Sequence, residues 1–173
     1  MGFGNNKIGI LGGSFDPAHK GHLAISKEAT KRFRLKKIIW AITKKNPLKK
    51  KSNNSLSVRI KRCKEITKNI NYIEVRFYEN KIKSNKTINL INHFIKNKKN
   101  EIFFLMGADS LINFHKWHKW KKITEKCNII VFDRFGYQKK SLNSISYKRL
   151  IKKNLKFIRF NKVNISSSQL RKI

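Results

Sequence analysis

Short apolar segments rich in β-branched and aromatic residues alternate along this chain with longer segments of helical periodicity. The short segments predict β-strands at Lys7–Leu11, Lys37–Ile42, Tyr72–Phe77, Glu101–Met106, Asn128–Phe132 and Lys156–Phe160. Between them, apolar residues recur at helical spacing, in the sets Ile25/Ala29/Phe33, Leu56/Ile60/Cys63/Thr67, Ile88/Ile91/Ile95 and Tyr147/Leu150/Ile151. This alternation predicts an α/β fold in which a mostly parallel sheet is covered by helices on both faces.

The chain has 173 residues and no internal repeat, so we expect a single domain over residues 1–173. No apolar run approaches the roughly 20 residues that span a bilayer, and the first residues lack the apolar stretch of a signal peptide. The only cysteines, Cys63 and Cys127, are far apart in the sequence and form no disulfide framework. These features predict a cytoplasmic protein that does not bind membranes.

The chain is strongly basic, with 42 Lys and Arg against 9 Asp and Glu and a net charge of +33. Such a charge is compatible with nucleic-acid binding, because cationic side chains release counterions from phosphates. The lysines are spread over the whole chain, however, and the densest cluster is only Lys44-Lys45 with Lys49-Lys50-Lys51. We therefore expect no specific nucleic-acid partner, although the charge would steer any polyphosphate ligand.

Aspartate is rare, and its few positions are informative. Asp16, Asp109 and Asp133 each lie within a few residues of the end of a predicted strand, which is where open α/β sheets bind their ligands. Asp16-Pro17 and Ser55 are also predicted helix starts, because a short oxygen-bearing side chain can accept from the free amides of a first helical turn.

The first strand is followed by the string Gly12-Gly13-Ser14-Phe15-Asp16-Pro17-Ala18-His19-Lys20-Gly21-His22. Gly12 and Gly13 would let the backbone approach a ligand and adopt φ values that other residues avoid. His19 and His22 lie one helical turn apart, beside amides that attract phosphate. The spacing matches neither a P-loop nor a dinucleotide fingerprint, and nearby residues complete no zinc site.

A second phosphate-type motif lies at the other end of the chain, in Ile165-Ser166-Ser167-Ser168-Gln169-Leu170-Arg171. Ser166 and Gln169 fit a capping box that opens a helix, and the guanidinium of Arg171 suits two phosphate oxygens. On its own, this string also fits an ordinary capped turn with an exposed arginine.

Together, the two strings resemble the G-G-[ST]-F-D-P-x-H-x-G-H and I-S-S-[ST]-x-[IVL]-R signatures of the nucleotidyltransferase superfamily. The resemblance implies a Rossmann-like, doubly wound fold. It also implies catalytic roles for His19, His22 and Arg171. By the same resemblance, ATP would be bound by Gly12, Gly13, Ser14, Phe15, Ile165, Ser166 and Ser167.

The middle of the chain resembles one family in that superfamily, the bacterial nicotinate-nucleotide adenylyltransferases. Met106-Gly107-Ala108-Asp109 and the later Trp117-His118 resemble its G-x-D-…-W segment. The resemblance places Gly107 and Asp109 at ATP, near the ribose, and Trp117 and His118 at the second substrate, with Trp117 stacked on the pyridine ring. The alternative is that Trp117 and Trp120 form helix core at i,i+3 spacing, which would hold for one of them.

Three further segments carry the same resemblance. Asn46-Pro47-Leu48-Lys49 is similar to an N-x-P-H-K loop with Leu48 in place of histidine, and it implies substrate binding by Lys49. Ser84–Leu90 is similar to S-x-T-x-D-T-L, departing at Lys86, Asn89 and Leu90 but keeping Thr87 for the nicotinate carboxylate. Ile129–Gly136 is similar to a strand that ends in R-x-G and assigns Arg134 to ATP.

The resemblance implies transfer of AMP from ATP to nicotinate mononucleotide, giving nicotinate adenine dinucleotide and pyrophosphate. Ser14 would also contact the second substrate, and Mg²⁺ would arrive with ATP, since it needs few protein ligands. Two alternatives stay open here: phosphopantetheine adenylyltransferase, and a basic nucleic-acid-binding protein on the same scaffold. The sequence also leaves open the oligomeric state and the preference between nicotinate and nicotinamide mononucleotide.

Overall fold

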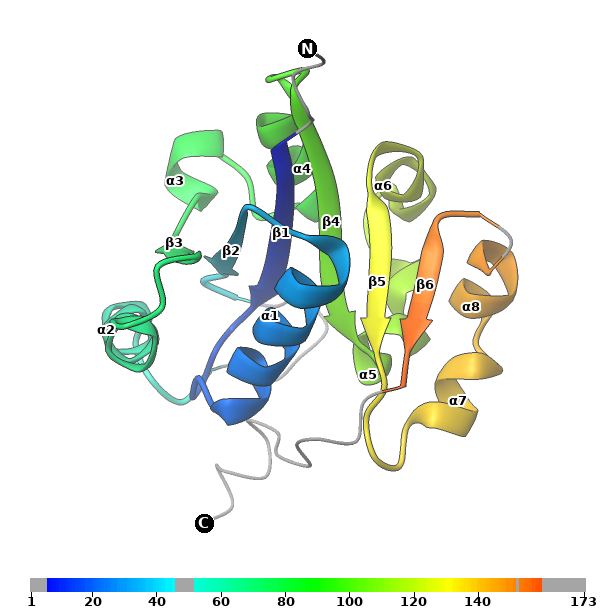
Figure 1. The fold of residues 1–173 in the computed structure, drawn as a ribbon, viewed down its shortest axis with the longest axis horizontal. Coiled ribbons are helices and arrows are strands. Elements are labelled where there is room, and N and C mark those ends of the chain that lie inside the picture. The colour runs from blue at the N-terminus through cyan, green and yellow to red at the C-terminus, as the bar shows by residue number, and fades with distance from the viewer. Residues whose placement is uncertain (1–5, 46–51, 152, 160–173) are drawn as a thin grey trace.

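A computed structural model describes residues 6–45, 52–151 and 153–159 of the chain. Within these ranges one six-stranded sheet has the order β3-β2-β1-β4-β5-β6, and every neighbouring pair is parallel (Figure 1). The strands are β1 (Asn6–Gly13), β2 (Lys37–Ile42), β3 (Ile73–Arg76), β4 (Asn100–Gly107), β5 (Asn128–Phe132) and β6 (Leu155–Ile158). All six predicted strands are confirmed, with ends that shift by at most two residues.

The predicted helical periods fall in α1 (Lys20–Phe33), α2 (Leu56–Thr67), α4 (Thr87–Ile95) and α8 (Ile145–Leu150). Ser55 caps α2 as expected, because its side chain accepts from the amide of Val58 at 3.3 Å. The unpredicted helical segments are α3 (Glu79–Ile82), α5 (Ala108–Ile112), η1 (Phe114–Lys116), α6 (Trp120–Lys126) and α7 (Gln138–Leu142). Among the described helices, none has the length and apolar character needed to cross a membrane.

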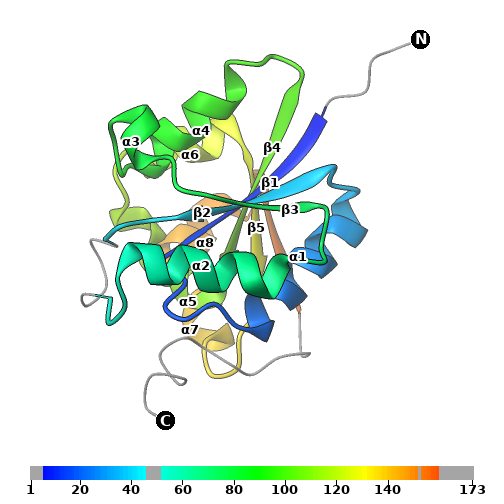
Figure 2. The same ribbon diagram turned by 90° about the vertical axis from the view of Figure 1, so that its left-hand side faces the viewer.

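Side chains alternate between the two faces of the sheet and build a separate core on each. One core joins residues such as Leu11, Trp40 and Leu105 to Ala29 of α1 and Cys63 of α2. The other joins the alternate strand residues to α4, α5, η1, α6 and α8. Figure 2 shows α1 on one side of the sheet and α4 and α6 on the other.

The strand order reverses direction between β1 and β4, which pair side by side with Ile10 opposite Phe104. From β1 the chain proceeds outward to β2 and β3, and from β4 it proceeds the other way to β5 and β6. The loops after β1 and β4 therefore diverge and leave a crevice at the carboxyl edge. In open α/β sheets such a reversal point is where ligands bind.

Candidate active site

Two histidines form the start of α1 at this crevice. His19 is the N-cap residue, and its Nδ1 accepts from the amide of Gly21 at 3.1 Å. His22 Nδ1 in turn accepts from the amide of His19 at 3.2 Å, which completes a capping box. The expectation that Asp16-Pro17 starts this helix is therefore wrong, since an imidazole nitrogen serves as the capping acceptor here.

This capping fixes which ring nitrogen carries the proton. A neutral imidazole has one acceptor and one donor, and Nδ1 accepts in both rings. Both histidines therefore carry their proton on Nε2, and the two rings lie with their centroids 3.9 Å apart. The pair presents N–H groups that can donate to an anion.

The charge state of His19 is set by its surroundings. Burial and, to a smaller extent, the positive charge of Arg134 lower the pKa of His19 to about 4. At neutral pH the imidazole is uncharged, so His19 would contact a phosphate through a neutral N–H donor.

His22 rests on buried aromatic side chains. Its ring centroid lies 4.7 Å from that of Phe15 and 5.8 Å from that of Trp40. Trp40 Nε1 donates to Ser26 Oγ at 2.9 Å, and Ser26 Oγ donates to the carbonyl of His22 at 2.8 Å. Trp40 and Ser26 are both fully buried, so they hold this turn of α1 against the sheet.

The backbone of the glycine loop differs from the expectation. Gly12 and Gly13 end strand β1, and neither has a positive φ. The expectation that these glycines adopt φ values avoided by other residues is therefore wrong. The positive φ of 49° belongs instead to Phe15, which is 1% exposed and packs beneath His22. This exposure is that of the whole residue, so the backbone of Phe15 is enclosed as well.

Asp109 and Arg134 meet across the ends of β4 and β5. Arg134 Nη1 lies 2.8 Å from Asp109 Oδ2, and both side chains are about three-quarters buried, at 28% and 20% exposure. The carboxylate folds back over Gly107, where an added Cβ would lie 2.5 Å from Asp109 Oδ1. Gly107 is therefore required for the position of Asp109 rather than for an unusual backbone conformation.

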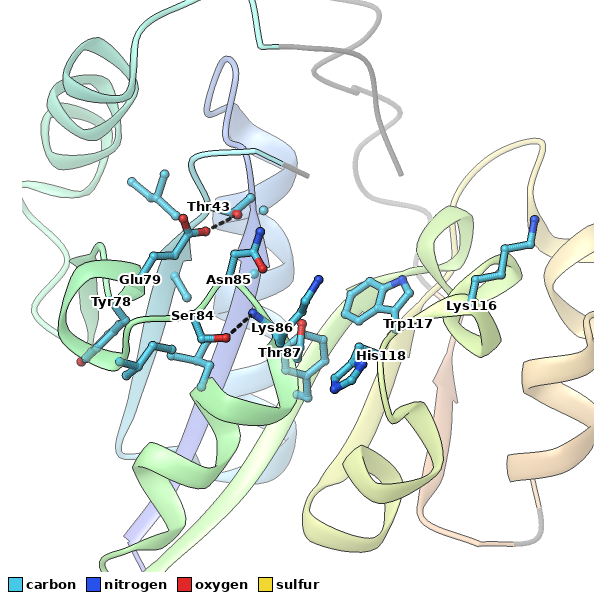
Figure 3. Close-up of a pocket in the computed structure, with 17 residues that line it drawn as sticks. Thr43, Tyr78, Glu79, Ser84, Asn85, Lys86, Thr87, Lys116, Trp117 and His118 are labelled. Atoms are coloured by element: carbon cyan, nitrogen blue, oxygen red, sulfur yellow. Dashed lines mark hydrogen bonds between the residues drawn. The ribbon is translucent and has the colours of Figure 1, made fainter. Parts of the chain in front are cut away.

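A pocket of about 390 Å³ opens at the carboxyl end of β1. Its lining includes five residues of the predicted site, Gly12, Gly13, Thr87, Trp117 and His118, so the structure places these residues around one pocket. Figure 3 shows Trp117 and His118 on one side of the pocket and Tyr78, Glu79 and Ser84 on the other, with Lys86 and Thr87 between them.

Trp117 is held at the pocket by other rings. Its indole meets Phe104 and Phe114 edge-on, with centroids at 5.9 and 5.2 Å. Trp120 opens α6 and also meets Phe114 edge-on, at 6.0 Å. Both tryptophans pack against the core while staying half-buried, and Trp117 also lines the pocket. The core interpretation and the binding interpretation of Trp117 are thus compatible.

The opposite wall of the pocket was not predicted from the sequence. Thr43 Oγ1 and the amide of Lys44 both donate to Glu79 Oε1, so the end of β2 is bound to α3. Tyr78 and Ile82 are further lining residues that were not predicted, as is Lys116 on the Trp117 side. Thr43 and Tyr78 had a usable signal, since each follows a predicted strand at the carboxyl edge, whereas Glu79 begins the short helix α3 and had none.

The remaining predicted residues divide into two groups. Ser14 lies at the crevice, where its carbonyl accepts from Arg59. Asp133 accepts from the amide of Arg134 at 2.7 Å, so it shapes the loop after β5. The predicted residues Lys49, Ile165, Ser166, Ser167 and Arg171, and the departure at Leu48, lie outside the described residues.

The donor set indicates what the crevice can bind. Imidazole and backbone N–H groups, together with the Arg134 guanidinium, suit phosphate oxygens. Within the described ranges, no group of three or more His, Cys, Asp or Glu side chains could hold a metal ion. The arrangement can therefore align and stabilise anions beside a pocket with an aromatic wall.

Comparison with known proteins identifies similar sequences over almost the whole chain. The Cytidylyltransferase-like family model matches residues 10–173. A protein of Pelagibacter ubique, named a probable nicotinate-nucleotide adenylyltransferase, is 64% identical over 96% of this chain and 93% of its own. A protein of Clostridium botulinum with the same name is 35% identical, over 96% of this chain and 84% of its own.

Solved structures show the same fold. A Plasmodium falciparum nicotinic acid mononucleotide adenylyltransferase superposes with a TM-score of 0.78 at 21% identity, covering 96% of this chain and 83% of its own. That protein was solved in complex with APC and also with NaAD. The likeness confirms the Rossmann-like α/β architecture expected from the sequence.

Proposed function

Because the chain belongs to the nicotinate-nucleotide adenylyltransferase family, within the wider Cytidylyltransferase-like family, we infer that it transfers AMP from ATP to nicotinate mononucleotide. A 5′-phosphate oxygen of the mononucleotide forms a bond to the α-phosphorus of ATP. The bond from that phosphorus to the β-phosphate oxygen breaks, and pyrophosphate leaves with the electron pair. The products are nicotinate adenine dinucleotide and pyrophosphate, so the reaction belongs to NAD biosynthesis.

The observation that carries this proposal is the histidine pair at the start of α1, in the segment that follows two glycines of the Trp117 pocket, Gly12 and Gly13. His19 and His22 present Nε2–H groups at a helix start, where phosphoryl charge is favoured. Donors placed where charge develops lower the barrier without any covalent intermediate. We therefore assign the two imidazoles to the ATP phosphates, with His22 nearer the reacting phosphorus.

The pocket would hold the mononucleotide. Trp117 offers an indole face to the pyridine ring, and Thr87 lies on the same lining, where it can reach the nicotinate carboxylate. His118 lies beside Trp117. The Asp109–Arg134 pair, which follows the ends of β4 and β5, would contact the ATP ribose and phosphates.

We propose that Mg²⁺ comes to the site bound to ATP. The donors described around the crevice are imidazoles, amides and a guanidinium, which bind the phosphate oxygens rather than the metal. Mg²⁺ keeps several waters and is often bound by one or two carboxylates together with substrate phosphates, which fits this donor set. It would neutralise charge on the leaving pyrophosphate.

ATP and nicotinate mononucleotide are the proposed partners, and we propose no specific nucleic-acid partner. Both substrates carry negatively charged phosphate groups, so the net charge of +33 would raise the rate at which they encounter the protein. Strong salt dependence of kcat/KM, without tight binding of duplex or single-stranded nucleic acid at physiological salt, would agree with this assignment.

The test is pyrophosphate release with Mg-ATP and one acceptor at a time: nicotinate mononucleotide, nicotinamide mononucleotide or 4′-phosphopantetheine. Release with nicotinate mononucleotide well above the other two is expected. Release only with phosphopantetheine would contradict the proposed acceptor.

A pair of variants tests the role of His22. In His22→Asn the side-chain oxygen of asparagine can replace Nδ1 as the acceptor for the backbone N–H of His19, but the Nε2–H donor of the imidazole is lost. We expect kcat to fall about 10²- to 10³-fold with little change in melting temperature, the usual effect of removing one transition-state donor. His115→Asn is the control, since His115 lies against Ser146 of α8. Equal kcat in the two variants would contradict the role assigned to His22.

A further inference from the structure

Helix α2 carries a buried arginine at the back of the crevice. Arg59 is 2% exposed, although a guanidinium keeps its charge in proteins and is costly to remove from water. Such a group persists inside a protein only where its N–H groups are bound. The positions of its partners therefore indicate its role.

The guanidinium binds four backbone carbonyl groups. Nη1 donates to Ser14 O at 2.6 Å and to Thr43 O at 2.9 Å. Nη2 donates to Lys44 O at 3.2 Å, and Nε donates to Asn54 O at 3.2 Å. One side chain thus joins the loop after β1, the end of β2 and the residue before the cap of α2.

A buried carboxylate binds the same region from the other side. Asp16 is fully buried, and its Oδ2 accepts from the amide of Asn53 at 2.6 Å and from that of Asn54 at 3.4 Å. Its Oδ1 accepts from Asn54 Nδ2 at 2.6 Å. Asn54 is therefore held through its amides by Asp16 and through its carbonyl by Arg59.

The two loops joined by Arg59 serve different parts of the site. Ser14 follows the glycines beside the histidine pair, whereas Thr43 lines the Trp117 pocket. A single nitrogen, Nη1, contacts both of their carbonyl oxygens. The Thr43 amide also donates to the Gly13 carbonyl at 2.9 Å, so the β1–β2 ladder sets the separation of the two strand ends. Arg59 holds the carbonyl groups that follow those ends.

We propose that Arg59 is a positioning residue for the transfer reaction. It fixes the loop after β1, which would bind the ATP phosphates, relative to the Trp117 pocket, which would hold nicotinate mononucleotide. The 5′-phosphate of the mononucleotide then lies in line with the α-phosphorus of ATP. This inference rests on the proposed function. In-line displacement is sensitive to such placement, because a shift of about 1 Å can cost about 10²-fold in rate. Arg59 itself would touch neither substrate.

The first experiment compares Arg59→Ala, Arg59→Lys and, as matched control, Arg62→Ala. Arg62 lies on the same helix with an exposed side chain. We expect kcat to fall about 100-fold in both Arg59 variants, with much smaller changes in the KM values for ATP and nicotinate mononucleotide. Lysine fails because it keeps the charge but lacks the planar fork that reaches several carbonyls. Wild-type kcat in Arg59→Lys would overturn the proposal.

Chemical rescue separates positioning from general loss of structure. Arg59→Ala leaves a space lined by four carbonyl acceptors, into which a guanidinium ion at low millimolar concentration can bind. Added guanidinium should restore much of kcat, whereas ammonium, which has no planar fork, should not. A folded Arg59→Ala protein whose kcat does not respond to guanidinium would overturn the proposal. If this variant does not fold, Arg59→Lys and the measurement below decide.

Hydrogen exchange gives a readout that is independent of the reaction. In Arg59→Lys we expect faster exchange of amides in residues 14–16 and 43–45, with unchanged exchange in α4 and β5. Unchanged exchange in both loops would overturn the positioning role. If the wild-type protein releases pyrophosphate with none of the three acceptors, the proposed function fails, while this measurement still tests whether Arg59 holds the two loops.

Discussion

Gly107→Ala tests whether the site depends on the close approach of Asp109 to the backbone. The new Cβ would lie 2.5 Å from Asp109 Oδ1, which real Cβ atoms essentially never do. Ordinary contact begins at 3.4 Å, so the carboxylate must move by about 0.9 Å. The other oxygen of the same carboxylate lies 2.8 Å from Arg134 Nη1, and a shift of this size directed away from Arg134 would stretch the contact to about 3.7 Å, beyond hydrogen-bond range.

The size of the effect follows from that lost contact. A hydrogen bond to a charged group contributes about 1.5–3 kcal/mol. At about 1.4 kcal/mol per factor of ten, kcat/KM for ATP should fall about 10- to 150-fold. We expect the loss in pyrophosphate release at limiting ATP, while the KM for nicotinate mononucleotide changes little.

A double-mutant cycle provides the control. In Asp109→Ala the oxygen that the new Cβ would meet is gone, so adding Gly107→Ala should cost nothing more. The double variant should therefore match Asp109→Ala within a factor of about two, the usual scatter of such cycles. Multiplicative losses, or wild-type kinetics in Gly107→Ala alone, would refute the argument.

Three further predictions concern the surroundings of the site. Ser26→Ala leaves the buried indole N–H of Trp40 without its acceptor, so the free energy of unfolding should fall by about 1–3 kcal/mol in urea titrations. The pKa of His19 is 6.5 in the unfolded chain and about 4 in the folded protein, so the unfolded state binds more protons between these values. The free energy of unfolding should accordingly decline as pH falls from 6.5 towards 4, a slope that His19→Gln reduces, and NMR should show a neutral His19 ring above pH 5. Trp117→Ala should raise the KM for nicotinate mononucleotide about 2- to 12-fold and leave the KM for ATP unchanged, which steady-state kinetics would check.

The sheet could be predicted because its strands are buried on both faces. Runs such as Ile38–Ile42 contain only apolar residues, and the structure buries every one of them. The long helices were also predictable, since their apolar positions follow the 3.6-residue period. Helices α3, α5 and α7, with four or five residues each, are too short for any period to appear in the sequence.

The candidate site was only partly predictable. The spacing of His19 and His22 indicated a shared helix face, but not that each Nδ1 is bound by a backbone amide. That arrangement depends on the backbone entering α1 at His19 with an extended conformation. Short-range sequence patterns do not specify such an entry.

Arg59 had a signal in the sequence that went unused. It lies three residues after Leu56 and four before Cys63, which places it on the apolar face of α2. A charged residue on a buried face must find partners inside the protein. The identity of those partners, four carbonyl oxygens from three segments, depends on tertiary structure and could not be predicted.

The three tryptophans lie in environments so different that they give the molecule a built-in optical reporter. Trp40 is fully enclosed beneath His22, and Trp120 packs at the start of α6. Of the three indoles, Trp117 is the one on the wall of the pocket. An electron-poor ring stacked on it would quench its emission and leave the other two largely unchanged. Occupancy of the acceptor pocket can therefore be followed by intrinsic fluorescence without ATP, without turnover and without a label.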